Sequence, residues 1–158
     1  MASAVATVRE SVRRHPSYRR VLVPVTGSAE SEHALEIGCA LAAEHGAVLT
    51  VVYVIEVSSL LPLDARMDVD EVAAREALRK AEAMSDAFGI RAHLRTVRAR
   101  DAGHAIVELA EQTRAEVVVL AAPRKRRAYG RLSGFGATVR LVLAKAPCRV
   151  LVIAPPTS

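Results

Sequence analysis

The sequence has no tryptophan and few aromatic residues of any kind: phenylalanine, tryptophan and tyrosine together make up 3% of its 158 residues. Proteins that bind single-stranded nucleic acid stack its bases on aromatic side chains, so this scarcity argues against specific nucleic-acid binding. The core must instead be aliphatic, and the hydrophobic share of the chain is 51%. With 25% charged residues, the composition is that of a globular protein.

Cysteine and long apolar runs are also scarce. The two cysteines, Cys39 and Cys148, are too few for a disulfide framework and lack a metal-ligand spacing, so we expect reduced thiols in the core. No apolar run reaches the roughly 18 residues that a membrane-spanning helix needs, and the N-terminus lacks the apolar stretch of a signal peptide. These absences favour a cytoplasmic location, and the chain length suits a single domain.

Residues arranged for catalysis are missing as well. The sequence has no HExxH or CxxC pattern for a metal, no GxSxG turn for a serine nucleophile and no GxxxxGK[ST] loop. His104, at the start of an expected helix beside Asp101, is interpreted as a capping or solvated residue. The sequence therefore predicts neither an enzyme nor a metal site.

The net charge of +5 is unevenly distributed along the chain. Residues 1–20 carry five arginines and one glutamate, and residues 124–131 carry five cations and no acid. The rest of the chain is therefore net negative, which is not the pattern of a uniformly basic nucleic-acid binder. We interpret residues 1–18 as a basic N-terminal tail in front of one domain over residues 19–156.

Hydrophobic periodicity predicts strands and helices in alternation. The expected strands span residues 20–25, 47–55, 90–97, 116–121 and 149–154, and the expected helices span residues 31–46, 70–89, 101–114 and 136–146. The inward stripe of the first helix is expected to consist of Ala34, Ile37, Gly38, Leu41 and Ala42. Alternation of apolar and polar residues in segment 90–97 favours a strand at a sheet edge. The order of elements predicts an α/β fold with a mainly parallel sheet and helices on both faces.

A glycine-rich turn before the last expected helix is the strongest candidate for a ligand site. In an open α/β sheet, ligands bind outside the carboxyl ends of the strands, where loops 26–30, 56–69 and 122–135 are expected to lie. The stretch GFGAT at 134–138 leads directly into the helix, whose free N–H groups and positive dipole end attract a phosphate. An ordinary glycine turn capped by Thr138 is the alternative interpretation.

The opening VLVPVTGS and the ending AKAPCRVLVI together resemble the universal stress protein family, and the resemblance extends over residues 18–155. It implies a Rossmann-like sheet of the adenine nucleotide alpha-hydrolase type, with five strands in the order 3-2-1-4-5. It also implies a homodimer formed through the last strand, from Arg149 to Ala154, at an open edge of the sheet. Some members of the family bind ATP and others do not.

The chain departs from the pattern G-x2-G-x9-G-[ST] of the ATP-binding members. Gly136 matches the third glycine, but Ala137 follows it, and Thr138 stands one place later. The aspartate that usually follows the proline of the first strand is replaced by Thr26.

The first two glycines of that pattern are also replaced. They fall on Ala121 and Arg124 when the strand end is matched, or on Pro123 and Arg126 when the loop length is kept. Glycine lets backbone N–H groups approach a triphosphate closely, and neither arginine nor proline reproduces that. Either the cations contact phosphate through their side chains, or the loop is a solvated basic flap.

These features favour a non-enzymatic regulatory module of the universal stress type, which acts in the stress response as a homodimer and binds ATP weakly or not at all. One alternative is a nucleotide-binding stress protein that uses arginines in place of the glycines. Another is the soluble regulatory domain of a membrane transporter, with the basic tail at an anionic membrane or partner surface. A nucleotide hydrolase is disfavoured, because no metal-binding acid pair or general base is evident.

The candidate ligand is an anion, ATP or another adenine nucleotide, although no cofactor is required by the sequence. The residues expected to contact it are Thr26, Gly27, Arg124, Arg126, Gly134, Gly136, Ala137 and Thr138.

Overall fold

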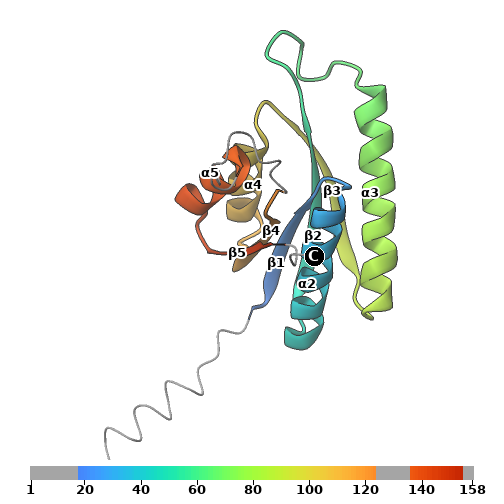
Figure 1. Cartoon of the computed structure of the whole chain (residues 1–158), viewed down its shortest axis with the longest axis vertical. Helices are drawn as coiled ribbons and strands as arrows, with labels where there is room; N and C mark the ends of the chain where they lie inside the picture. Colours follow the sequence, from blue (N-terminus) through green and yellow to red (C-terminus); the bar gives the residue numbers. More distant parts are fainter. Residues whose placement is uncertain (1–17, 124–135, 155–158) are drawn as a thin grey trace, which may run out of the picture.

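The structure of the protein is a computed structural model that describes residues 18–123 and 136–154. Its centre is a five-stranded parallel sheet in the order β3-β2-β1-β4-β5 (Figure 1). The strands are β1 (Arg20–Val25), β2 (Val48–Glu56), β3 (Ala92–Ala99), β4 (Val117–Ala121) and β5 (Arg149–Ile153). The predicted α/β class and the strand order 3-2-1-4-5 are thus confirmed, and every pairing in the sheet is parallel.

In the described part of the chain, four helices cover the two faces of the sheet, as expected for right-handed crossovers between parallel strands. They are α2 (Ala29–His45), α3 (Asp68–Ala87), α4 (Ala102–Gln112) and α5 (Ala137–Lys145). Helices α2 and α3 pack on one face, and α4 and α5 pack on the other (Figure 1). No helix in this part of the chain combines the length and the apolar character needed to cross a bilayer.

The core is aliphatic and lies on both faces of β1 and β4, the central and adjoining strands. Val23 and Val119 are fully buried beneath α2, while Leu22 and Val118 are buried beneath α4 and α5. Burial on both faces explains why these strands appear in the sequence as continuous apolar runs rather than alternating ones.

The inward face of α2 differs from the predicted stripe at one position. Ala34, Gly38 and Ala42 are buried as expected, but Ile37 is 36% exposed. Leu35 and Cys39 are buried in its place, because α2 is rotated about its own axis so that positions 34–35 and 38–39 face the sheet. The stripe of small residues in the middle lets the helix lie close to β1.

The predicted element boundaries are correct to within about two residues. Helix α2 begins earlier than expected because Ser28 caps it, its side chain accepting a hydrogen bond from the backbone N–H of Ser31. It ends at Gly46, whose φ of 62° is the left-handed conformation that favours glycine after a helix. Strand β3 is shifted by two residues and runs to Ala99.

Strand β3 forms one edge of the sheet, as the alternation predicts, and it carries basic side chains. Arg91, just before the strand, and His93 and Arg95 within it are exposed. Arg98 and Arg100 instead turn toward the loop between β2 and α3. There Arg98 also binds the carboxylate of Glu71 at 2.7 Å.

The loop between β2 and α3 is tied to β3 through its backbone. The guanidinium group of Arg98 donates to the backbone carbonyls of Leu63 and Ala65. That of Arg100, just after the strand, donates to the backbone carbonyls of Val57, Ser58 and Leu61. The tip of the loop carries apolar side chains outward, and Leu60 is 91% exposed. The two arginines therefore hold in place a loop that buries little apolar surface of its own.

Candidate functional site

A cavity of about 910 Å³ opens at the carboxyl end of β1, β2 and β4. Its walls come from the ends of these strands, the loop between β1 and α2, and the first turns of α2, α3, α4 and α5. The apolar part is formed by Pro24, Val25, Val54, Ile106, Leu120, Ala121 and Val139. The position is the one at which open parallel sheets bind ligands, and the mixture of apolar walls with a few polar groups is typical of small-molecule sites.

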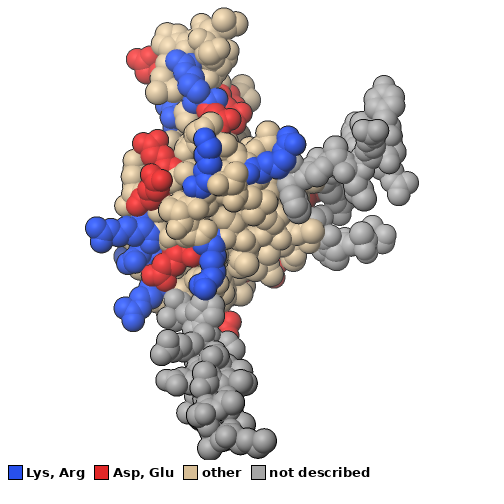
Figure 2. Space-filling model, turned by 90° about the vertical axis from the view of Figure 1, so that its left-hand side faces the viewer, with Lys and Arg blue, Asp and Glu red and all other residues tan. Residues whose placement is uncertain are grey.

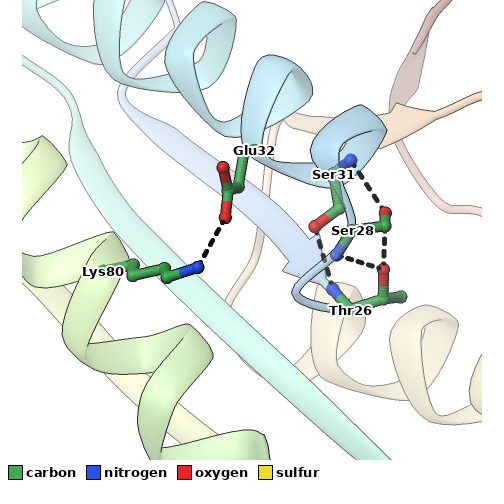
Figure 3. A network of polar contacts seen from close by, with 5 residues as sticks. All are labelled: Thr26, Ser28, Ser31, Glu32 and Lys80. Atoms are coloured by element: carbon green, nitrogen blue, oxygen red, sulfur yellow. Dashed lines mark hydrogen bonds and ion pairs between the residues drawn. The ribbon is translucent and has the colours of Figure 1, made fainter.

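A network of hydroxyl groups fixes the loop between β1 and α2 at one side of this cavity (Figure 3). The hydroxyls of Thr26 and Ser28 are hydrogen-bonded to each other at 2.9 Å. The hydroxyl of Ser31 accepts from the backbone N–H of Thr26 at 3.0 Å, and Ser28 accepts from the N–H of Ser31 at 3.2 Å. The start of α2 is thus satisfied by its own side chains, and no carboxylate stands at position 26.

The same loop requires a glycine at position 27, and the helix that follows it is joined to α3 by an ion pair. Gly27 has a φ of 81°, which side-chain-bearing residues rarely adopt. Across the helix pair, the ammonium group of Lys80 in α3 donates to Glu32 in α2 at 3.2 Å (Figure 3). Both side chains are partly exposed, so this ion pair contributes orientation more than stability.

The N-terminus of α4 is also occupied by the chain's own acids. Asp101 accepts from the backbone N–H of His104 at 2.9 Å and contacts the His104 ring nitrogen Nδ1 at 2.8 Å. These hydrogen bonds, above all the one from the backbone N–H, lower the pKa of Asp101. One carboxylate oxygen of Glu56, the last residue of β2, accepts from the N–H of Ala102 at 2.9 Å. The interpretation of His104 as part of a cap therefore agrees with the geometry.

The N-terminus of α5 differs from those of α2 and α4, and it lacks the acidic first turn of α3. Gly136 precedes the helix, and no side-chain cap satisfies its first N–H groups within the described residues. Gly136, Ala137 and Thr138 all line the cavity. A Cβ on Gly136 would lie 3.1 Å from Cγ of Pro123, so a side chain here would crowd the opposite lip of the site. The free N–H groups make this helix end the natural place for an anion.

The charge of the described lining is negative. Glu30, Glu56 and Asp70 line the cavity, and no lysine or arginine among residues 18–123 and 136–154 does so. The same part of the chain contains no group of three or more His, Cys, Asp or Glu placed to hold a metal ion. A ligand with one anionic end therefore fits best with that end at α5 and its neutral end toward β2.

The structure brings together part of the predicted site. Thr26 lines the same cavity as Gly136, Ala137 and Thr138, which lie more than a hundred residues later in the chain. Gly27 shapes the adjoining turn without lining the cavity. The remaining predicted contacts, Arg124, Arg126 and Gly134, lie outside the described residues.

Sequence reasoning missed several polar residues of the lining. The lining also contains Ser28, Ser31, Glu56 and Asp70, none of which is among the predicted contacts. The signal for Glu56 was its place as the first polar residue after the apolar strand at 47–55, on one of the loops expected at the ligand-binding end. Asp70 could be found only from the path of the loop that precedes α3.

Comparison with known proteins identifies relatives of this chain. The family model described as "Universal stress protein family" matches residues 17–154. A curated relative, universal stress protein MJ0531 of Methanocaldococcus jannaschii, is 28% identical over 145 residues, which cover 88% of this chain and 84% of the relative.

Solved structures of similar proteins share the fold. The structure of a universal stress protein from Archaeoglobus fulgidus superposes with a TM-score of 0.72 at 25% identity, covering 86% of this chain and 98% of that one. A second structure from the same organism, in complex with dAMP, superposes with a TM-score of 0.68 at 22% identity, covering 87% and 98%. These likenesses extend over nearly all of the part of the chain that the structure describes.

Proposed function

Because the chain belongs to the universal stress protein family, we propose that it is a homodimeric regulatory module of the stress response that binds an adenine nucleotide weakly and does not turn it over. The observation that carries this proposal is the cavity at the carboxyl end of the sheet, with the uncapped start of α5 on its wall. A relative of the same fold has been solved with dAMP, which supports an adenine nucleotide as the ligand.

A nucleoside monophosphate suits this site better than a triphosphate. One phosphate can be held by the N–H groups of Gly136, Ala137 and Thr138 at the helix end. A triphosphate needs further backbone donors in the preceding loop, where Pro123 has no N–H group and arginines replace glycines. The carboxylates of Glu30 and Asp70 in the lining add repulsion for each further phosphate charge.

Turnover of the nucleotide is not expected. Hydrolysis of a phosphate ester needs a positioned base, an electrophilic group or a metal ion near the reacting phosphorus. Around the start of α5 the described lining offers hydroxyl and apolar groups, and no histidine lines the cavity there. The site is thus suited to sense a nucleotide by binding it.

The homodimer is proposed on the geometry of β5. Within the described residues this strand pairs only with β4, and Val150, Leu151, Val152 and Ile153 remain partly exposed. The side of the molecule with α4, α5 and β5 faces the viewer in Figure 2, where Lys, Arg, Asp and Glu leave a broad central area without charge. An open apolar strand edge favours pairing with a second copy across a two-fold axis.

Ligand binding is tested by calorimetry on the full chain with AMP and with Mg-ATP. We expect AMP to bind with a dissociation constant between about 1 μM and 1 mM, which corresponds to about −8 to −4 kcal/mol, and Mg-ATP to bind no more tightly. Thr138→Val keeps the shape of the side chain and removes the hydroxyl, and it should weaken AMP binding. Sub-micromolar binding of Mg-ATP, measurable phosphate release, or no binding of any adenine nucleotide at millimolar concentration would contradict the proposal.

Dimerisation is tested separately at the edge of β5. The carbonyl of Ile153 accepts from Ala122, so the backbone of Ile153 faces β4 and that of Val152 faces the open edge. Val152→Pro therefore removes an outward N–H group and leaves the bonds to β4 intact. We expect a dimer by sedimentation velocity for the wild type and for the control Val152→Ala, and a monomer for Val152→Pro. A wild-type monomer at tens of micromolar would refute the dimer.

A role as the attached domain of a membrane transporter stays a prediction of the sequence, as does the cytoplasmic location.

A further inference from the structure

We infer that Glu56 determines base specificity in the cavity by accepting a hydrogen bond from an exocyclic amino group, the 6-amino group of adenine. This inference rests on the proposed nucleotide binding and adds to it a residue that distinguishes one base from another. Glu56 ends β2, lines the cavity and is exposed toward it. It has no counterpart in the glycine pattern from which the site was first predicted.

The carboxylate of Glu56 is held in one orientation. Its oxygen Oε1 accepts from the backbone N–H of Ala102, the first residue of α4, at 2.9 Å. The next residue, Val57, donates its own N–H to the carbonyl of Ala99 at 2.8 Å, so the backbone beside Glu56 is fixed to β3. One oxygen is thus committed to the protein, while no hydrogen bond within the described residues uses Oε2, and the Glu56 side chain lines the cavity.

The four helix starts that line the cavity in the described part of the chain set the direction of a bound nucleotide. Ser28 caps α2, and Asp101 together with Glu56 satisfies the start of α4. Neither α3 nor α5 has a side-chain cap within the described residues, but the first turn of α3 carries Asp68, Asp70 and Glu71, whereas that of α5 carries no acid. The phosphate therefore belongs at α5, beside β4, and repulsion from Glu56 reinforces that direction.

The base then lies at the other end of the cavity. Strands β4, β1 and β2 are adjacent in the sheet, so β4 and β2 are about 10 Å apart, two strand spacings, a span that a nucleoside monophosphate covers. Val54 and Ile106 line the cavity near Glu56 and offer apolar surface to the faces of the base. The edge of the base thereby meets a fixed carboxylate.

A carboxylate can only accept hydrogen bonds at neutral pH, so it favours a base edge that donates. The 6-amino group of adenine supplies such a donor. A purine with hydrogen at position 6 has no donor there and leaves the Oε2 atom without a partner. Loss of a hydrogen bond to a charged group costs about 1.5–3 kcal/mol, which is roughly a 10- to 100-fold change in affinity.

The test compares AMP with purine riboside 5′-monophosphate, which has hydrogen in place of the amino group, by calorimetry on the full chain. For the wild type we expect AMP to bind at least about tenfold more tightly. In Glu56→Gln the amide carbonyl can still accept from Ala102, while the amide NH₂ faces the cavity and opposes the adenine amino group. Glu56→Gln should therefore bind AMP and purine riboside 5′-monophosphate with about equal affinity.

Asp70→Asn is the matched control, because it removes one negative charge from the same lining. It should change the affinities for both nucleotides by the same factor and leave their ratio intact. Thermal unfolding of each variant checks that the fold persists. Equal binding of the two nucleotides by the wild type, or an unchanged ratio in Glu56→Gln, would overturn the inference while the proposed function stands. Failure of both nucleotides to bind the wild type would refute the proposed function itself, and the inference with it.

Discussion

Gly38 of α2 and Val23 of β1 are in such close contact that a Cβ built on Gly38 would lie 2.5 Å from Cγ2 of Val23. Valine has little rotameric freedom, so its methyl group cannot move aside cheaply. The contact explains how α2 approaches the sheet closely enough to bury Ala34 and Ala42 completely.

Gly38→Ala is therefore expected to destabilise the protein, although alanine is the better helix former. Overpacking costs about 1–3 kcal/mol and exceeds the gain in helix propensity of about 1 kcal/mol, which leaves a net loss on the order of 1 kcal/mol. Urea unfolding measures the change. In the double variant with Val23→Ala, the added methyl fills space that the valine vacates, so the combined loss should be smaller than the sum of the single losses. Strict additivity would contradict the contact.

Asp101 gives α4 a cap whose strength depends on pH. Hydrogen bonds from His104 lower the pKa of Asp101 below its unfolded value of about 3.9. The stabilisation is therefore complete at pH values well above 3.9 and is lost as the pH falls through the folded pKa. We expect Asp101→Ala to lower the free energy of unfolding by about 1 kcal/mol at pH 7, and the difference from wild type to narrow near pH 3.

Asp101→Asn is the control for that pH dependence, since asparagine can cap a helix but does not titrate. Its stability relative to Asp101→Ala should stay nearly constant between pH 7 and pH 3. A gap between wild type and Asp101→Ala that does not change with pH would show that the carboxylate is not the capping group.

The two thiols should differ in reactivity. Burial, and secondarily the negative charge of Glu36, raises the pKa of Cys39 to about 11, and its side chain is fully buried. Burial also raises the pKa of Cys148, which is nevertheless partly exposed. Since the thiolate is the reactive form, we expect slow labelling of Cys148 by a thiol reagent at pH 8 and none of Cys39 until the protein unfolds. Native Cys148→Ala should stay unlabelled, and rapid labelling of that variant would contradict the burial of Cys39.

Most of the fold could be predicted because the burial of each strand determines the pattern of apolar and polar residues in its sequence. Strands β1 and β4 are covered on both faces, so they appear as apolar runs, while β3 at the edge alternates. The orientation of α2 was less predictable, because its apolar and small residues occupy a wide arc and either Ile37 or Leu35 could face the sheet. Packing against Val23 decides between them, and that contact is not visible in the helix alone.

The candidate site was predictable only where a local motif marks it. The glycine turn before α5 identified Gly136 and Thr138, and the end of β1 identified Thr26. Glu56 and Asp70 approach the same cavity because of the order of strands and the path of a loop. Such convergence depends on tertiary structure, so no spacing within the sequence reveals it.

The loop between β2 and α3 should owe its order to Arg98. Arg98→Met keeps an apolar stem but removes the bonds to the carbonyls of Leu63 and Ala65 and to Glu71. We expect trypsin to cleave after the exposed Arg66 several-fold faster in this variant, because cleavage requires local opening. Arg95→Met is the matched control on the same strand, since Arg95 is exposed and has no hydrogen bond or ion pair in the described part of the chain. Equal cleavage rates in the two variants would contradict the role of Arg98.

The cationic edge at β3 limits how many copies can join one sheet. A parallel sheet with two open edges could grow without end, each copy adding its strands to the next. Here Arg91 and Arg95 would face the same charges on an approaching β3, and two like edges would repel each other. In the dimer proposed above, association through β5 would consequently stop at a pair, and the basic residues of β3 would keep such pairs from joining into fibres.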